Sequence, residues 1–394
     1  MTHYKTFSTN AIRVGSDPDP INGSVIPGIF QTSTYVQPQA GKPKWHDYTR
    51  CGNPTRANLE ACLASLEEAG HCVVTASGLA AISCVLNLFK SGANIICGND
   101  VYGGTYRLLA TIFEDRYNVK WVDTTDVANV QKACEEFAFE EKKVDLLWVE
   151  ALSNPLLRIT DIESVAKIVK KANSNALTCV DSTFLTPFFQ KPLQLGADLV
   201  VHSATKYING HSDVIAGAIL TNSKTLYEKL YYVQKTLGPS LSPFDSWLIS
   251  RGVKTLKIRM LAHQENAIQV AEFLENHPKI EKVLFAGLKG HKNADILKSQ
   301  TLNGFNGGGM ISIYIKGTQE QARKFVESLK IFQLAESLGG VESLACIPSL
   351  MTHASVPKEI RDANGITQNL VRFSVGIEGI EDLIDDITQA LELI

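Results

Sequence analysis

Residues 144–180 read VDLLWVEALSNPLLRITDIESVAKIVKKANSNALTCV, and this stretch decides the fold. The apolar run Val144–Val149 is typical of a buried strand, and Leu177–Val180 is a second run of the same kind. Between them, the apolar residues of 162–169 recur at the spacing of one helix face. A strand, a helix and a second strand predict a parallel pair with the helix packed on the sheet.

The same alternation continues on both sides of this stretch. Thr160 and Glu163 have the spacing of a capping box, which predicts where the intervening helix begins. Further short apolar runs are Cys72–Ala76, Asn94–Cys97, Val119–Asp123 and Leu199–Val201, and a helix is expected at Leu79–Phe89. The repetition predicts an α/β fold with a mostly parallel sheet flanked by helices.

The pattern changes after about residue 240 and predicts a smaller C-terminal α/β domain. A long helical stretch is expected from Asp245 to Leu274. It is followed by a strand at Met310–Ile315, a helix at Gln319–Leu329, a strand at Val371–Val375 and an amphipathic helix over 383–394. We therefore expect an N-terminal arm over 1–50, a large domain over 51–250 and a small domain over 251–394.

Composition excludes several classes of protein. The 394 residues are 44% hydrophobic and 20% charged, with a net charge of −3, so no basic surface for nucleic acid is expected. No segment has the length and apolar character of a membrane span, and Met1–Lys5 lacks the apolar core of a signal peptide. The eight cysteines are scattered without a C-x-x-C pair, which favours reduced thiols in a cytoplasmic protein. With no H-E-x-x-H and no Cys/His cluster, no metal site is expected.

The segment Ser203–His211, SATKYINGH, directly follows one of the predicted strands. Lys206 therefore lies at a strand end, beside small hydroxyl residues and before a glycine-containing loop. A lysine amine must lose its proton to attack an aldehyde, and burial favours that loss. Ser203 and Thr205 offer hydroxyl groups to a phosphate. The segment suits Schiff-base chemistry, although such a tetrad on its own is more often a surface turn.

Three other segments place polar or aromatic side chains at strand ends. Asp181 follows the run Leu177–Val180, where a carboxylate can keep a pyridinium nitrogen protonated and make the ring an electron sink. Ser77 and Gly78 lie between a strand and a helix, a position that favours a phosphate. Tyr102 also follows a strand and is placed to stack on an aromatic cofactor. Alone, each has an ordinary explanation as a cap, a turn or a packed tyrosine.

Five motifs then occur in order. They are Tyr48-Thr49-Arg50 with Gly52-Asn53-Pro54-Thr55-Arg56, Ser77-Gly78, Val101-Tyr102-Gly103-Gly104-Thr105, Ser203-Ala204-Thr205-Lys206-Tyr207 and Ala335-Glu336-Ser337-Leu338-Gly339-Gly340. Over essentially the whole chain they resemble the Cys/Met-metabolism family of fold-type I pyridoxal-5′-phosphate (PLP) enzymes. Within that family the chain looks most like the cystathionine γ-lyases. The resemblance implies a PLP-dependent carbon–sulfur lyase of transsulfuration, acting in cysteine and amino-acid biosynthesis and methionine metabolism.

The resemblance also implies roles for the matching residues. Lys206 carries the cofactor as a Schiff base, Asp181 pairs with the ring nitrogen, and Tyr102 stacks on the ring; these are the expected catalytic residues. The other expected cofactor contacts are Asn154 at the ring hydroxyl oxygen, Ser77, Gly78, Leu79, Ser203 and Thr205 around the phosphate, and Tyr48 and Arg50 at the phosphate of a neighbouring subunit. The shared site implies a homodimer, usually paired into a homotetramer.

The expected partner besides a second copy is a small sulfur-containing amino acid. The resemblance implies that Arg372 binds its α-carboxylate, a role that an Arg fork suits because it can bind a carboxylate bidentately. The remaining expected substrate contacts are Ser337, Glu336, Tyr48 and Arg107.

The chain departs from the family pattern in three places. Ser153-Asn154-Pro155 stands where the family usually has Thr-Asn-Pro, and Asp181-Ser182-Thr183 stands where it has Asp-Asn-Thr. Both changes spare the residues expected to touch the cofactor. Cys346 stands where many γ-lyases have Glu.

Two features bear on the choice among relatives. Gly104 occupies the position where methionine γ-lyases have Cys, and Glu336 is an acid that β-lyases usually lack. A carboxylate there suits the distal amino group of cystathionine, although a solvated loop acid is the alternative. Tyr48-Thr49-Arg50 and Arg107-Leu108-Leu109 also look like β-lyase sequence. The order of preference is therefore γ-lyase, β-lyase and γ-synthase.

Two other classes are disfavoured. A dinucleotide-dependent oxidoreductase would need a G-x-G-x-x-G after the first strand, and none is present; Gly307-Gly308-Gly309 precedes a strand instead. A protein that binds PLP without catalysis is disfavoured because Lys206, Asp181 and Arg372 are all retained.

Overall fold

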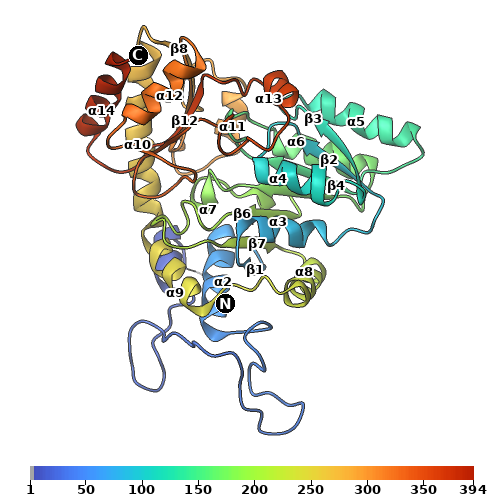
Figure 1. Cartoon of the computed structure of the whole chain (residues 1–394). Coiled ribbons are helices and arrows are strands. Elements are labelled where there is room, and N and C mark those ends of the chain that lie inside the picture. The colour runs from blue at the N-terminus through green and yellow to red at the C-terminus, as the bar shows by residue number, and fades with distance from the viewer. Residues whose placement is uncertain (1–3) are drawn as a thin grey trace. The chain divides into compact units, whose positions relative to one another are not determined.

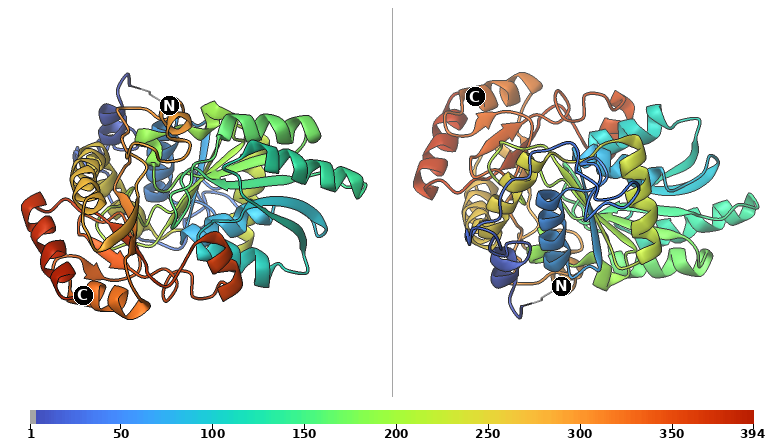
Figure 2. Two further views of the ribbon diagram at one scale, coloured as in Figure 1. Left: turned by 90° about the horizontal axis from the view of Figure 1, so that it is seen from above. Right: turned by 90° about the horizontal axis from the view of Figure 1, so that it is seen from below.

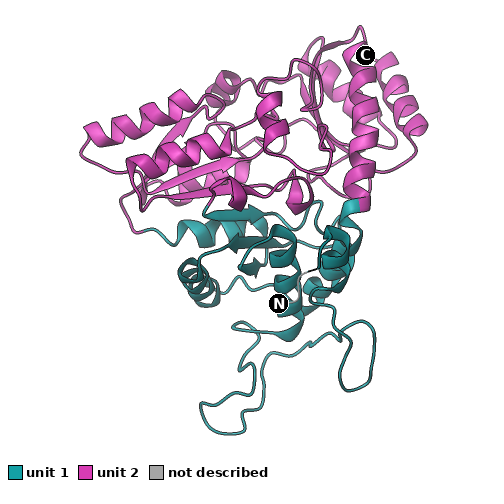
Figure 3. Cartoon of the chain, turned by 180° about the vertical axis from the view of Figure 1, so that it is seen from behind, with its two compact units in different colours: residues 1–89, 198–257 teal, residues 90–197, 258–394 magenta. Residues whose placement is uncertain are grey.

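The computed structural model describes residues 4–394. Residues 1–3, which begin the expected arm and the N-terminal segment compared with a signal peptide, lie outside them. The chain divides into two compact units, residues 1–89 with 198–257 and residues 90–197 with 258–394 (Figure 3). The domain boundaries expected near residues 50 and 250 stay a prediction.

Unit 1 contains three strands in the order β1 (His71–Thr75), β7 (Gly217–Thr221) and β6 (Leu199–His202). β7 is antiparallel to both neighbours, and the sequence analysis did not anticipate it. The helices of this unit are α1 (Phe7–Arg13), α2 (Pro54–Glu67), α3 (Gly78–Leu86), α8 (Lys224–Leu237), α9 (Pro243–Gly252) and η3 (Val253–Thr255). α2 begins at Pro54 because the side chain of Asn53 accepts hydrogen bonds from the main-chain N–H groups of Thr55 and Arg56.

An irregular arm connects α1 to α2. Figure 1 shows it as long blue loops that leave the helices of unit 1. Several of its large apolar side chains are exposed, among them Ile21 (93%), Val36 (92%) and Trp45 (80%). The segment between α1 and α2 presents an apolar surface that a single copy of unit 1 leaves uncovered. The expected arm over residues 1–50 also includes α1 and stays a prediction.

Unit 2 contains four parallel strands in the order β5 (Leu177–Asp181), β4 (Leu146–Glu150), β2 (Ala93–Gly98) and β3 (Tyr117–Val122). β2 and β4 are buried along their whole length, as central parallel strands are. The accompanying helices are α4 (Gly103–Arg107), η1 (Leu108–Ile112), α5 (Val127–Phe139), α6 (Ile162–Ala172), α7 (Thr186–Phe189) and η2 (Pro192–Leu195). The parallel strand–helix–strand unit predicted over 144–180 is confirmed as β4, α6 and β5.

The predicted capping box of α6 is wrong by one residue. The N-cap is Asp161, whose side chain accepts a hydrogen bond from the Ser164 N–H at 3.0 Å. The Thr160 hydroxyl is instead buried against the Thr124 hydroxyl at 2.6 Å. The Thr160 hydroxyl is hydrogen-bonded to a residue distant in sequence and so does not cap the helix as the local pattern predicted.

The C-terminal part of unit 2 forms a second sheet of five strands. Their order is β10 (Gln333–Leu334), β11 (Leu344–Cys346), β12 (Leu370–Ser374), β9 (Met310–Ile315) and β8 (Ile280–Leu284). The helices are α10 (Leu256–Glu275), α11 (Ala294–Ser299), α12 (Gln319–Ser328), α13 (Lys358–Asn364) and α14 (Ile380–Glu392). A buried apolar cluster from α10, β9, α12, β12 and α14 forms its core. Figure 2 shows α14, in red, and α5, in blue-green, at opposite ends of unit 2.

The long helix expected from Asp245 to Leu274 is interrupted. α9 ends at Gly252, the turn η3 follows, and α10 then runs from Leu256 to Glu275. A Cβ at Gly252 would lie 2.3 Å from the carbonyl oxygen of Asn209, so close main-chain packing requires glycine there. Among residues 4–394, no helix combines the length and the apolar character needed to cross a bilayer.

Candidate active site

The carboxyl ends of β4 and β5 bring two acidic side chains side by side. Glu150 ends β4 and Asp181 ends β5, and the two are register partners in the parallel pair. Asp181 Oδ1 accepts hydrogen bonds from the Thr183 N–H at 3.0 Å and the Thr183 hydroxyl at 2.5 Å. The turn after β5 therefore fixes the orientation of the Asp181 carboxylate at the edge where α/β sheets bind ligands.

Glu150 connects the loops that follow β2 and β4. Its Oε1 accepts a hydrogen bond from the Tyr102 N–H at 2.6 Å, and its Oε2 accepts one from the Asn154 N–H at 2.9 Å. Burial raises the pKa of Glu150 well above its usual range, and the neighbouring Asp181 raises it further. The sequence analysis did not select Glu150, although it ends an apolar strand in the same way as Asp181.

Arg372 projects from β12 into the same group of residues. Its Nη1 donates to Asn154 Oδ1 and its Nη2 donates to the Ser337 carbonyl oxygen, each at 2.9 Å. Arg372 is only 2% exposed, and its Nε is buried without a hydrogen-bond partner among residues 4–394. Ser337 has a φ of 111°, an uncommon main-chain conformation for a residue with a side chain. The guanidinium is held from two sides by two of its five N–H donors, which leaves the Nε–H and one N–H on each Nη for a ligand.

Four charged side chains act on the hydroxyl of Tyr102. Burial is the largest effect and raises the pKa of its hydroxyl. Arg107 and Arg372 lower that pKa, whereas Glu336 and Glu150 raise it. Glu336 is exposed, and Arg107 donates to the Ser355 hydroxyl at 3.2 Å. Unit 2 thus brings together the predicted residues Tyr102, Asn154, Arg107, Glu336, Ser337 and Arg372.

His353 is a second residue that the sequence did not indicate. Its Nε2 lies 3.1 Å from the Asn154 carbonyl oxygen and 3.3 Å from that of Val101. Burial, then the charge of Arg372, lowers the pKa of His353 to about 4, so the ring is neutral and donates through Nε2. A Cβ at Gly103 would lie 2.3 Å from the Thr352 carbonyl oxygen, so these two segments pack main chain to main chain.

In unit 1, the start of α3 lies against the loop after β6. Ser77 is the N-cap of α3, and its hydroxyl accepts a hydrogen bond from the Ala80 N–H at 3.0 Å. A Cβ at Gly78 would lie 2.9 Å from the Cβ of Ser203, so only glycine permits this approach. Leu79 lies in the first turn of α3, where main-chain N–H groups have no partner within the helix. Hydroxyl groups and helix N–H groups meet here as an anion requires.

Lys206 lies in the same loop as Ser203. The Lys206 N–H donates to the Ser203 carbonyl oxygen at 3.1 Å, and the Lys206 carbonyl oxygen accepts from the Gly210 N–H at 2.8 Å. The Thr205 hydroxyl accepts from the Ala216 N–H at 2.9 Å, which ties the loop to the start of β7. The side chain of Lys206 is half-buried.

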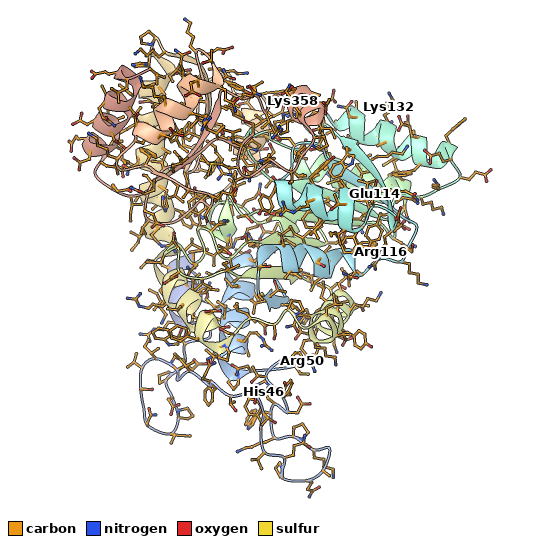
Figure 4. All side chains as sticks on the ribbon, viewed as in Figure 1. His46, Arg50, Glu114, Arg116, Lys132 and Lys358 are labelled. Atoms are coloured by element: carbon orange, nitrogen blue, oxygen red, sulfur yellow. The ribbon has the colours of Figure 1, made fainter. Side chains whose placement is uncertain are left out.

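Tyr48 and Arg50 lie on the arm, near its junction with α2 (Figure 4, which labels Arg50). The guanidinium of Arg50 lies 5.4 Å from the centre of the Tyr48 ring, and Arg50 Nη1 donates to the carbonyl oxygen of Lys235 at the end of α8. Tyr48 is 43% exposed. Both side chains are therefore partly available at the surface of unit 1.

Comparison with known proteins assigns this arrangement to a family. A family model described as "Cys/Met metabolism PLP-dependent enzyme" matches residues 8–392. The chain belongs to this family. It is a PLP-dependent enzyme, and the predicted family and cofactor are confirmed.

Similar members of the Cys/Met-metabolism family match along their full length. A cystathionine γ-lyase of Dictyostelium discoideum is 46% identical, over 99% of this chain and 98% of that protein. A cystathionine β-lyase of Lactococcus lactis subsp. cremoris is 47% identical, over 98% of this chain and 99% of that protein. A solved cystathionine γ-synthase of Xanthomonas oryzae pv. oryzae, in complex with cystathionine, has a TM-score of 0.93 and 42% identity, with 98% of each chain covered. These likenesses confirm the predicted fold, fold type I with a mostly parallel sheet and a second, smaller sheet.

The residues present fit PLP. Gly78 lets the start of α3 approach Ser203 closely, and this helix start offers N–H groups to a phosphate. Asp181 is an oriented carboxylate at the carboxyl end of β5, as a pyridinium nitrogen requires. The lyase character indicated by the relatives' names agrees with the enzyme class that the sequence predicted.

Proposed function

We propose that the chain cleaves the Cγ–S bond of L-cystathionine to give cysteine, 2-oxobutyrate and ammonia. One observation carries the proposal: Arg372 is buried and held by Asn154 and Ser337, with Tyr102 and Glu336 beside it. The guanidinium of Arg372 can bind the α-carboxylate of a substrate, and Glu336 can bind an ammonium group at its far end. This pair suits a substrate that has an amino acid group at each end. The keto acid formed from cystathionine tests the proposal.

The proposed cofactor contacts follow the sequence prediction. When bound, PLP supplies an electron sink that stabilises negative charge on the substrate α-carbon. Asp181 keeps the ring nitrogen protonated, Tyr102 stacks on the ring and Asn154 contacts the ring hydroxyl oxygen. Ser77, Gly78, Leu79, Ser203 and Thr205 hold the phosphate.

The proposed catalytic steps depend on Lys206. Its Nζ would hold the cofactor and would carry protons at the substrate during turnover. Nζ then removes the Cα proton and moves protons at Cβ, so that the Cγ–S bond breaks and cysteine leaves. Addition of water to the remaining four-carbon fragment gives 2-oxobutyrate and ammonia. Arg372 and Ser337 hold the α-carboxylate during these steps, with Tyr48 and Arg107 as further substrate contacts.

β-Cleavage is the second candidate. The Lactococcus lactis relative that carries the β-lyase name is 47% identical, close to the 46% of the Dictyostelium γ-lyase, so overall identity does not separate the two. Glu336 favours γ-cleavage, because it is an acid at a position where β-lyases usually lack one, and a carboxylate there suits the distal amino group of cystathionine. γ-Synthase activity ranks third.

Glu336→Ala tests the proposed contact with the far end of cystathionine. Cysteine has no distal ammonium group, so the loss should appear with cystathionine and be small with cysteine. A partly desolvated charge-assisted hydrogen bond contributes about 1.5–3 kcal/mol, which corresponds to roughly a ten- to hundredfold selective loss in kcat/KM. Steady-state kinetics on both substrates provide the measurement.

The matched control is Glu327→Ala, which removes an exposed carboxylate of α12 that pairs with Arg323. It should change neither substrate's kinetics. Equal losses on the two substrates for Glu336→Ala would show that Glu336 shapes the loop and does not bind the distal ammonium group.

We further propose that the active form is a homodimer, paired into a homotetramer, in which Tyr48 and Arg50 reach the cofactor phosphate of the neighbouring copy. The exposed apolar side chains of the arm support a second copy as its partner. A cytoplasmic location is part of the same proposal, and the eight free cysteines are compatible with it.

A mixing experiment tests the shared site. Arg50→Ala should weaken PLP retention, because the phosphate loses a guanidinium contact. Mixed with Lys206→Ala, it should recover part of the activity, since one site of a hybrid dimer has both residues intact. Mixing each variant with itself is the control. Absence of recovery in a mixture shown by mass spectrometry to exchange subunits would rule out the shared site.

A further inference from the structure

We infer that Glu150 is a positioning residue whose buried carboxylate fixes the two loops that carry Tyr102 and Asn154. The inference rests on the proposed roles of Tyr102 and Asn154 as cofactor contacts. Glu150 is 7% exposed and ends β4 at the carboxyl edge of the parallel strands.

The contacts of Glu150 are divided between two separate loops. The Tyr102 N–H binds Oε1 at 2.6 Å, and the Asn154 N–H binds Oε2 at 2.9 Å. Tyr102 belongs to the loop after β2 and is 48 residues away in sequence, whereas Asn154 follows β4 by 4 residues. One rigid carboxylate therefore sets the separation of the two main-chain segments.

The position of Asn154 also affects Arg372, the residue proposed to bind the substrate carboxylate. The side chain of Asn154 accepts the Nη1 donor of Arg372, and the main-chain carbonyl of Asn154 accepts the Nε2 donor of His353. Displacement of the Asn154 main chain would shift both partners. Glu150 thus acts on the guanidinium of Arg372 through Asn154 without touching it.

The charge of Glu150 is costly for the fold, which argues for a functional role. Its neighbours Asp181 and Asp100 are acids, and both disfavour its ionised form. Among residues 4–394, Glu150 forms no ion pair with a lysine or arginine. A buried carboxylate without a cation is unfavourable.

Glu150→Gln is the decisive variant. The amide keeps the size of the side chain but offers one acceptor, and its NH₂ group then faces a main-chain N–H. Apoenzyme from the full chain is titrated with PLP, and binding is followed by protein fluorescence. We expect about a 10- to 100-fold higher Kd, because one buried main-chain N–H loses its acceptor. At saturating PLP, the circular dichroism of the cofactor band should change, and KM for the substrate should rise through Arg372.

Asp386→Asn supplies a matched control. Asp386 on α14 is a 4% exposed carboxylate that accepts the main-chain N–H groups of Lys330, Ile331 and Phe332 at 2.8–3.0 Å. The substitution also replaces a buried carboxyl group by an amide, but its N–H partners lie in the segment that leads into the second sheet. It should lower the Tm and leave the PLP Kd unchanged. If the two variants raise Kd equally at equal loss of Tm, Glu150 is only structural and the inference fails.

Three more variants distinguish the positioning role of Glu150 from the proposed cofactor contacts of Tyr102 and Asn154. Glu150→Asp keeps the carboxyl group but is one methylene shorter, so it should also raise the PLP Kd; it serves if Glu150→Gln does not fold. If Tyr102→Ala and Asn154→Ala leave the Kd unchanged, the proposed cofactor contacts are wrong. If they raise it and neither Glu150 variant does, the contacts stand and the positioning role of Glu150 is refuted.

Discussion

Lys206→Ala is expected to abolish the visible absorbance band of the bound cofactor and nearly all turnover. Alanine has no amine to form the Schiff base or to carry the Cα proton, so one step loses its nucleophile and the other its proposed base. The loop should remain in place, because main-chain hydrogen bonds of Lys206 with Ser203 and Gly210, and the bond between Thr205 and Ala216, do not involve the Lys206 amine. Absorbance spectroscopy and keto acid assays measure both effects.

Lys224→Ala is the control for this variant. Lys224 is an exposed lysine at the start of α8 in the same unit, with a side chain 80% exposed. It should retain the band and full activity. A yellow and active Lys206→Ala protein would show that another residue carries the cofactor.

Asp181→Asn is expected to reduce kcat by at least about 100-fold while PLP stays bound. An amide of the same shape keeps an oxygen for the Thr183 N–H but has no charge to hold the ring nitrogen protonated. Losses of about 10²–10³-fold are typical when one such electrostatic contact is removed. Kinetics at saturating substrate, together with the absorbance of bound cofactor, provide the measurement.

Asp161→Asn is the matched control, because Asp161 caps α6 in the same unit and asparagine caps a helix equally well. Its kcat should stay unchanged. If Asp181→Asn also retained the normal kcat, the carboxylate of Asp181 would have a structural role only.

Strand ends were the part of the site that sequence could predict. Asp181, Tyr102 and Lys206 each follow a short apolar run, and the carboxyl ends of parallel strands collect ligand-binding residues. Glu150 follows the same rule but was passed over, because no motif names it. His353 has no local signal: its role depends on a long-range contact with Val101 and Asn154.

Tertiary contacts also explain where the predicted elements differ from the structure. Periodicity continues through Gly252, where the main chain packs closely against Asn209, and the turn η3 then separates α9 from α10. The Thr160 hydroxyl has the right spacing for a cap, but it is bound to Thr124. Neither partner is near in sequence, so a local pattern contains no trace of it.

The keto acid formed from cystathionine shows whether the enzyme cleaves the Cγ–S bond. The pure enzyme with PLP is incubated with L-cystathionine, and the keto acid and the thiol are identified by mass spectrometry, with Lys206→Ala as the blank. We expect 2-oxobutyrate and cysteine, the products of Cγ–S cleavage. Pyruvate and homocysteine would mean cleavage of the Cβ–S bond and would contradict the proposal.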